Sequence, residues 1–329
     1  MSVVLAWCAA LALGGCAPVD TVADAPLDTD ARDSGGGGAD SDDSATGGSD
    51  DTGDTSADTA PPAGPWRQVS AGTLISCGLL EGGSVRCWGD DARGQTTTPE
   101  GVFTAVSAGL YHACAVRDDA ALICWGDDNG GQVEGAPEGR FVQVSASALH
   151  SCALTEDGAI FCWGDDGDGR VSGAPAGSFT QVTTGDDFGC ALGADGAVIC
   201  WGEDDADQVS GAPGGAFVQV TAGGDHACAL DAVGVVTCWG SDAYAQLTPP
   251  DVAFDQLDAG SWHTCGLIGQ AALCWGADGQ VNFGQVPAVA GDFLQLSSGG
   301  WHNCAVDTDG QARCWGDDTA GQSTVPEVR

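Results

Sequence analysis

Cysteine is the residue type whose number and spacing could do most chemistry in this sequence of 329 residues, 16 of which are cysteines. Fourteen cysteines form seven pairs, separated by ten residues or, in the sixth pair, by nine. The pairs are Cys77/Cys87, Cys114/Cys124, Cys152/Cys162, Cys190/Cys200, Cys228/Cys238, Cys265/Cys274 and Cys304/Cys314. A zinc site needs four convergent ligands, and each copy offers two cysteines. We therefore predict seven disulfides, which persist in oxidising compartments outside the cytoplasm.

Histidine could supply general acid–base chemistry, but its placement favours a structural role. All five histidines occupy one position relative to the cysteine pairs, and two other copies carry Ile75 and Phe188 there. Replacement by isoleucine and phenylalanine indicates a buried slot, in which a histidine needs a hydrogen-bond partner. Five symmetric copies cannot share one active site, and no nucleophile or metal-hydrolase motif occurs. We predict no catalytic residue, no enzymatic activity and no cofactor. The histidines are His112, His150, His226, His263 and His302.

A carboxylate follows within two residues of the Trp-Gly pair that comes directly after each second cysteine. Asp165, Asp168 and Asp204 are weak candidates for calcium ligands, because carboxylate oxygens suit this cation. No copy has a complete calcium-loop signature. Solvated turns are the favoured interpretation, and we predict no metal site.

The elements that position these residues repeat along the chain. First cysteines of successive pairs lie 37 to 39 residues apart, which indicates one supersecondary unit copied seven times. In the third copy, residues 141–146, 150–155 and 159–164 are predicted strands, and 169–175 is a short fourth segment. A three-residue hairpin loop ending in Gly158 places Cys152 opposite Cys162, at an expected Cα separation of about 4.5 Å.

Strand alternation makes both faces of each small sheet apolar, with Phe161 and Trp163 on one face and Ile160 and Cys162 on the other. We therefore expect both faces to be buried between neighbouring sheets. The predicted fold is all-β, a seven-bladed β-propeller. Its repeats span 66–102, 103–140, 141–178, 179–216, 217–253, 254–292 and 293–329.

The stretches LHSCALTEDGAIFCWGDD and GWHNCAVDTDGQARCWGDDTAGQ resemble the regulator of chromosome condensation repeat. The resemblance covers residues 66–329 and implies a seven-bladed propeller. The asparagine that the family places after Trp-Gly is mostly acidic here. Nuclear members exchange nucleotide on a small GTPase in a reducing compartment, so an exported, disulfide-bonded member is not expected to do so. Secreted members can bind and block other proteins.

The residue before the histidine slot changes around the ring and is expected at an exposed turn. Closing the ring joins five apolar positions into one arc, which is the predicted partner-binding site: Trp262, Trp301, Leu74, Tyr111 and Leu149. Tryptophan and tyrosine are frequent interface anchors, and exposed apolar arcs usually mark a partner. The alternative is that these side chains fold down onto neighbouring blades.

The N-terminal region is different in composition. Residues 1–15 resemble a bacterial lipoprotein signal peptide, although no basic residue follows Met1, and Cys16 would be acylated. An ordinary cleaved signal is the alternative. Residues 16–65 then form a disordered linker, since they are rich in Asp, Ser, Thr and Gly and cannot bury a core.

The net charge of −38, with no lysine, argues against nucleic acid and anionic lipid as partners. We predict a monomeric, non-enzymatic protein-binding propeller at the bacterial envelope, held to the outer membrane only by its lipid anchor, or else secreted. A glycan-binding or glycan-active surface protein is the alternative, because tryptophan and aspartate on one rim also suit sugars.

Overall fold

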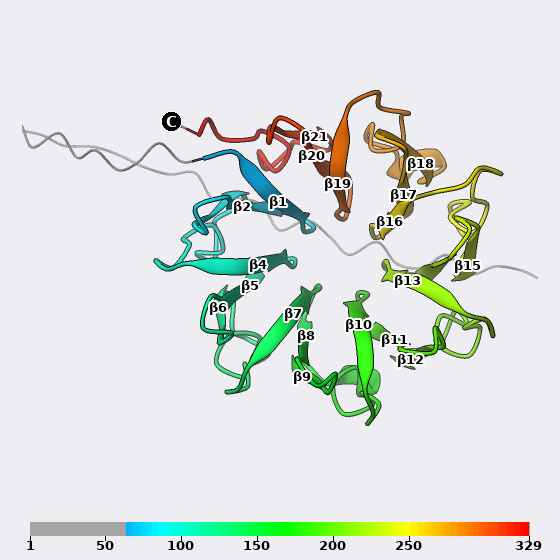
Figure 1. Cartoon of the computed structure of the whole chain (residues 1–329), viewed down its shortest axis with the longest axis horizontal. Coiled ribbons are helices and arrows are strands. Elements are labelled where there is room, and N and C mark those ends of the chain that lie inside the picture. The colour runs from blue at the N-terminus through cyan, green and yellow to red at the C-terminus, as the bar shows by residue number, and fades with distance from the viewer. Residues whose placement is uncertain (1–63, 329) are drawn as a thin grey trace, which may run out of the picture. The chain divides into compact units, whose positions relative to one another are not determined.

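The computed structural model describes residues 64–328, so the predicted signal peptide, the lipidation site Cys16 and nearly all of the linker lie outside the described residues. Seven three-stranded antiparallel sheets surround a central axis (Figure 1). The predicted all-β seven-bladed propeller is confirmed. Over residues 64–328, no helix is long and apolar enough to cross a membrane.

Each blade uses three consecutive strands, with the first innermost (Figure 1). In chain order the elements are β1 (Trp66–Ala71), β2 (Ile75–Leu80), β3 (Val85–Gly89), β4 (Phe103–Ala108), β5 (His112–Arg117), β6 (Leu122–Gly126), β7 (Phe141–Ala146), β8 (His150–Thr155), β9 (Ile160–Gly164), η1 (Gly167–Gly169), β10 (Phe179–Thr184), β11 (Phe188–Gly193), β12 (Val198–Gly202), β13 (Phe217–Ala222), β14 (His226–Asp231), β15 (Val236–Gly240), β16 (Gln256–Ala259), β17 (His263–Ile268), β18 (Ala271–Gly276), η2 (Gly279–Val281), β19 (Phe293–Ser298), β20 (His302–Asp307) and β21 (Ala312–Gly316).

The hairpins that carry the cysteines have the expected strand pairing. Thr155 N donates to Ala159 O at 3.0 Å and closes the third hairpin, whose Gly158 has a φ of 88°. Cys152 lies directly opposite Cys162 in the antiparallel pair. Each bridge between such opposed cysteines fixes the register of one hairpin and leaves the blades covalently unlinked.

All seven predicted disulfides are formed, but their geometry differs from the expected one. The Cα separations are 4.0 to 4.1 Å, shorter than the separation expected for an open ladder site. The bridge itself accounts for the difference, because two short side chains joined at their sulfurs draw the strands together. The pairs are Cys77–Cys87, Cys114–Cys124, Cys152–Cys162, Cys190–Cys200, Cys228–Cys238, Cys265–Cys274 and Cys304–Cys314.

Two expectations about the blade edge are wrong. Residues 169–175 run from the last residue of η1 through a turn and add no fourth strand, so β9 is the outermost strand of its blade. Phe161 is 46% exposed on that strand, and Ile199 is equally exposed on β12, so the face carrying them is not buried throughout. The reason is common to both positions, because a side chain on an uncovered edge strand has no outer neighbour to pack against.

Burial of the other face is also less complete than expected at the second cysteine of each pair. The first cysteines, on the middle strands, are all fully buried. Among the second cysteines, which lie on the outermost strands, Cys124 and Cys274 are buried at 9% and 7% exposure. The others are half-buried because the edge strand is covered on one side only: Cys87, Cys162, Cys200, Cys238 and Cys314.

The hydrophobic core lies between blades and consists of seven clusters. In one cluster Phe141, Val144 and Trp163 of the third blade pack on Cys114 and Val116 of the second. Burying a side chain as large as phenylalanine contributes about 1.5–3 kcal/mol. The propeller therefore depends on every blade having a neighbour on each side.

Side chains of the inner strands join neighbouring blades around the channel. Gln143 Nε2 donates to Val182 O at 3.0 Å, and Val182 N donates to Gln143 Oε1 at 3.1 Å. The same pair of bonds recurs from Gln68, Gln181, Gln219, Gln256 and Gln295. Ala105 stands at this position in the second blade. These glutamines satisfy inner-edge groups that would otherwise lack a backbone partner.

Candidate functional site

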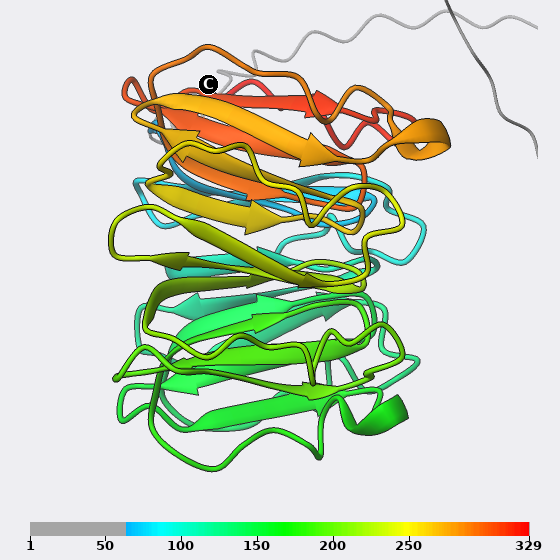
Figure 2. The ribbon, with the colours of Figure 1, turned by 90° about the vertical axis from the view of Figure 1, so that its right-hand side faces the viewer.

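The end of the propeller at which each first strand turns into the second is here called the loop face. The third strand of each blade ends there too, since Asp90 N donates to Leu74 O at 3.0 Å across the two connections. Both short 3-10 helices lie at this end (Figure 2). The opposite end, which carries loops such as 156–158, is called the hairpin face. All five predicted partner-binding residues lie on the loop face.

The histidines lie beneath the loop face and join blades. His302 Nε2 lies 2.7 Å from Ser76 Oγ, and His112 Nε2 lies 2.8 Å from Ser151 Oγ. His226 and His263 contact Thr264 and Asn303 in the same way. His150 turns its Nδ1 to Ser147 instead, because the next blade has Gly189 at the partner position.

All five histidines are buried, and burial lowers their pKa to about 3 to 4. Where the slot holds Ile75 or Phe188, the partner position of the next blade holds Ala113 or Ala227. At these two seams residue and partner change together, whereas the third blade keeps His150 beside Gly189 and bonds it to Ser147 of its own blade. The predicted structural, hydrogen-bonded role is confirmed.

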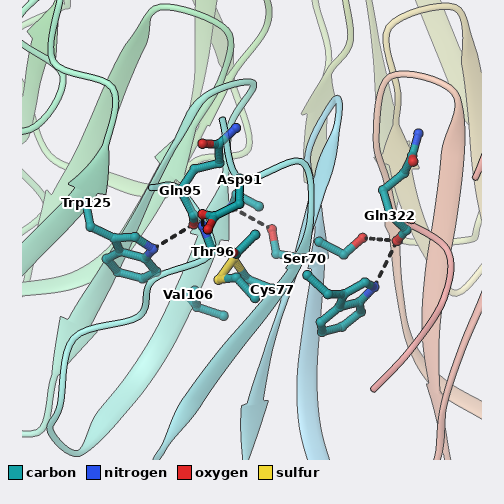
Figure 3. The surroundings of a disulfide bond; sticks show 12 residues. Ser70, Cys77, Asp91, Gln95, Thr96, Val106, Trp125 and Gln322 are labelled. Carbon is teal, nitrogen blue, oxygen red and sulfur yellow. Dashed lines mark hydrogen bonds between the residues drawn. A yellow bond between two sulfur atoms is a disulfide. The ribbon is translucent and has the colours of Figure 1, made fainter. Parts of the chain in front are cut away.

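The Trp-Gly motif supplies a second bond between blades. Trp125 Nε1 of the second blade donates to Gln95 O of the first at 2.9 Å (Figure 3). At the seam between the seventh and first blades, Gln322 O accepts from both Trp88 Nε1 and Ser76 Oγ, each at 2.9 Å (Figure 3). The recurring polar groups of the repeat thus hold the blades together.

The carboxylates of the three calcium candidates already contact hydrogen-bond donors or a cation of the protein itself. Asp204 Oδ1 accepts from the backbone amides of Val209 and Ser210, each at 2.8 Å, and these bonds lower the pKa of Asp204. Asp165 and Asp168 lie 3.4 and 4.0 Å from the guanidinium of Arg170. Across residues 64–328, no group of three or more histidine, cysteine or acidic side chains is arranged to hold a metal.

The predicted arc is partly exposed and contains more aromatic residues than expected. Leu149 is 38% exposed, and the other four members are half-buried. Trp262 contacts Tyr244 of the preceding blade edge to face, with ring centroids 5.1 Å apart. Trp301 contacts Phe283 likewise at 6.4 Å, and Phe283 is 51% exposed. Each tryptophan therefore packs on an aromatic residue of the neighbouring blade, as the alternative interpretation expects. Each also keeps part of its surface exposed, as a binding site requires.

Tyr244 and Phe283 were missed in the sequence. Both stand two residues before the buried glutamine of their repeats, Gln246 and Gln285. The same position holds Arg93 in the first blade, and its Cζ lies 4.6 Å from the ring centroid of Tyr111. Comparing this position among the copies could have identified them.

The other side of the loop face is acidic. Asp187 and Asp225 take the place of the apolar arc there, and Arg170 pairs with Asp187. Burial, together with the charges of Asp187 and Asp225, raises the pKa of Asp186 to about 7. One ring of turns thus carries an apolar half and an anionic half.

The central channel contains a cavity of about 310 Å³ lined by glutamine, serine and threonine side chains. Asp258 is the one ionisable residue among the described residues that line it. It accepts from Thr221 Oγ1 at 3.1 Å and Ser298 N at 2.7 Å, and burial raises its pKa to about 6. The carboxylate is held in place by the inner strands.

Comparisons with known proteins agree with this architecture. The Regulator of chromosome condensation (RCC1) repeat matches residues 66–95, 103–132, 141–170, 179–208, 217–246 and 293–322. The sixth blade, with its shorter hairpin, is not matched but is formed. No curated protein sequence matches the chain.

Three solved structures illustrate the likeness. The ectodomain of the Physcomitrella patens receptor kinase CR4 is 26% identical, with a TM-score of 0.66 over 77% of this chain and 74% of that one. The CRINKLY WD40 ectodomain of the Arabidopsis thaliana receptor kinase ACR4 is 25% identical, with a TM-score of 0.64 over 77% and 98%. Prp20p from Saccharomyces cerevisiae is 15% identical, with a TM-score of 0.62 over 74% and 83%, and supports the fold alone.

Proposed function

The chain belongs to the regulator of chromosome condensation (RCC1) repeat family, and from this we propose that it is a non-enzymatic, monomeric propeller that binds a protein partner at the bacterial cell envelope. The binding surface is the apolar half of the loop face. It comprises Trp262, Trp301, Leu74, Tyr111 and Leu149, extended by Tyr244 and Phe283.

One observation carries this proposal. Two tryptophans on adjacent blades, each paired with an aromatic residue of the preceding blade, keep part of their surface in solvent on the same face. Aromatic side chains of this kind are enriched among the residues that dominate binding energy. The scaffold below them is held by disulfides and by buried hydrogen bonds, so binding requires little ordering of the site.

Seven disulfides and the likeness to receptor ectodomains indicate an exported protein. The finer location is part of the proposal. We place the chain on the outer membrane through acylated Cys16, on the sequence around that cysteine alone. Metabolic labelling with a fatty acid tests it, since Cys16→Ser should abolish incorporation.

The test of partner binding is capture from surface extracts with the mature chain as bait. Trp262→Ala combined with Trp301→Ala should abolish capture and leave the near-ultraviolet circular dichroism and the unfolding midpoint nearly unchanged. Val233→Ala is the matched control, because Val233 is a 74% exposed apolar residue on the hairpin face. Capture that survives the double change, or is lost with Val233→Ala, contradicts the proposal.

A glycan-binding or glycan-active head is the second candidate, favoured by an acidic and an aromatic residue on neighbouring turns of the loop face, since Asp317 N donates to Trp301 O at 2.9 Å. A glycan array probed with the same protein separates the two. Saturable binding to one glycan class that is lost with Trp301→Ala supports the glycan interpretation over the protein interpretation.

A further inference from the structure

Each seam between blades brings three positions together on the loop face. The first position lies two residues before the buried glutamine of a repeat. In the third blade Arg170 takes the place of that glutamine, and the position is counted from it in the same way. The second is the residue before the histidine slot of the next blade, and the third follows Trp-Gly in that next blade. The backbone holds the last two together, since Asp127 N donates to Tyr111 O at 2.8 Å and Asp317 N donates to Trp301 O at 2.9 Å. The seven seams are thus seven versions of one site.

The seam between the first and second blades shows what this site can hold. The guanidinium carbon of Arg93 lies 4.6 Å from the ring centroid of Tyr111. Its Nη1 lies 2.6 Å from Asp127 Oδ1. An arginine is therefore held between an aromatic face and a carboxylate, and all three groups belong to the protein. The cation is satisfied by a cation–π contact and by an ion pair together.

The seam between the sixth and seventh blades has an aromatic residue and a carboxylate at the same positions without the arginine. Its three positions are Phe283, Trp301 and Asp317. Trp301 offers a larger ring than Tyr111, and tryptophan is the best of the three aromatic side chains for cations. Asp317 Oδ2 accepts from Gln322 Nε2 at 2.7 Å and Thr319 Oγ1 at 2.8 Å, and Oδ1 accepts from Thr319 N at 3.3 Å, all neutral donors. A carboxylate has about four acceptor sites, so its charge is left to attract a further donor.

Among the described residues, no other seam has this combination. The seam between the fifth and sixth blades is aromatic but has Ala277 at the third position, and those before the first and third blades have leucine at the second. The remaining seams carry aspartate at the second position: Asp187 and Asp225. At the first of these, Arg170 again supplies a cation, to Asp187 and Asp165.

We propose that Phe283, Trp301 and Asp317 bind the guanidinium of an arginine presented by the protein partner. The proposal rests on the proposed function and specifies its chemistry. A planar guanidinium can lie on an indole and donate to a carboxylate at once, which an ammonium does less well. The net charge of the chain, −38, favours the approach of a cationic partner. The partner's contact surface should therefore carry an arginine near apolar side chains that cover the rest of the arc.

The test uses capped arginine, N-acetyl-arginine amide, and needs no partner. The indole N–H resonances of the full mature chain are followed by NMR at physiological salt, and that of Trp301 is identified by its loss in Trp301→Phe. We expect the Trp301 resonance to shift saturably with arginine and far less with N-acetyl-citrulline amide, a neutral compound of nearly the same shape. Asp317→Asn should weaken arginine binding about three- to fivefold, whereas Asp309→Asn, which removes one charge from the hairpin face, should leave it unchanged.

Equal shifts with arginine and citrulline, or equal binding by Asp317→Asn and the native chain, would overturn the proposal, as would shifts spread evenly over all indoles. The citrulline comparison is made on the native protein, so it holds even if a variant fails to fold. Loss of partner capture in the alanine variants alongside a negative arginine result would refute this site alone. If arginine binds but the alanine variants capture the partner as well as the native chain does, the proposed function alone would be refuted.

Discussion

Changes at His302 and Ser76 should have non-additive effects on the free energy of unfolding. Ser76 has one hydroxyl proton, which it donates to Gln322 O at 2.9 Å, so His302 Nε2 must be the donor in the 2.7 Å contact. Ser76→Ala removes the bond to Gln322, worth about 1 kcal/mol, and leaves a buried imidazole N–H without a partner, which costs about 1–3 kcal/mol. We expect a loss of about 3 kcal/mol in the free energy of unfolding.

His302→Phe should cost about 1 kcal/mol, since one hydrogen bond is lost and Ser76 keeps Gln322. Combining both changes recreates the native combination of Phe188 with Ala227 at another seam. The unpartnered N–H is then gone, so the double variant should be about 2 kcal/mol more stable than the sum of the single losses. Guanidinium unfolding at pH 7.5 with disulfides intact measures all three.

The control combines Ser76→Ala with His226→Phe, because His226 bonds to Thr264 in a distant blade. These two losses should add within about 0.5 kcal/mol. Additive losses for His302→Phe and Ser76→Ala would refute the reasoning, as would coupling of equal size in the control pair.

Three further perturbations test the scaffold. Ala105→Gln should raise the thermal midpoint, because the new amide can bond both backbone groups of Val144 as the other glutamines do; an unchanged or lower midpoint would contradict this. Burial keeps the pKa of the five histidines at about 3 to 4, below the ordinary 6.5, so the unfolded chain binds more protons and stability should fall as pH drops from 6.5 towards 4. The pKa of Asp258, raised to about 6, acts in the opposite sense, so Asp258→Ser should steepen that fall in a series of melting curves; a shallower fall would show that the carboxylate is not buried as described. Replacing Cys190 and Cys200 by serine should cost about 3 kcal/mol in denaturant unfolding, and no loss would mean that the bridge does not constrain the unfolded chain.

The sequence was informative wherever seven copies could be compared. The period, the hairpin loop and the cysteine spacing together predicted the blade, because a left-handed glycine such as Gly158 and an opposed cysteine pair leave one register. Replacement of histidine by Ile75 and Phe188 predicted burial of the slot. It did not reveal Ser76 as the partner, because the bond joins residues separated by 226 positions.

The short fourth segment of the third repeat is not a strand, for a local reason that the sequence pattern did not show. The carboxylate of Asp166 accepts from the amides of Val171 and Ser172, at 3.0 and 2.8 Å. Because those amides already donate to Asp166 within the loop, they cannot form backbone hydrogen bonds with β9. Tyr244 was missed for a related reason, since a loop residue becomes part of a site only when the neighbouring blade is in place.

The ring closes without a strand shared between its ends. The seam of the first and seventh blades uses the glutamine pair of bonds, here between Gln295 and Val69 at 2.9 Å, and the histidine contact found at other seams. Trp66 N also donates to Gly310 O at 2.8 Å, and Val325 packs in the same cluster as Trp66. No blade is therefore privileged as the first. A circularly permuted chain, opened in a loop that crosses between blades and with a linker between residues 328 and 64, should keep the contacts between the blades.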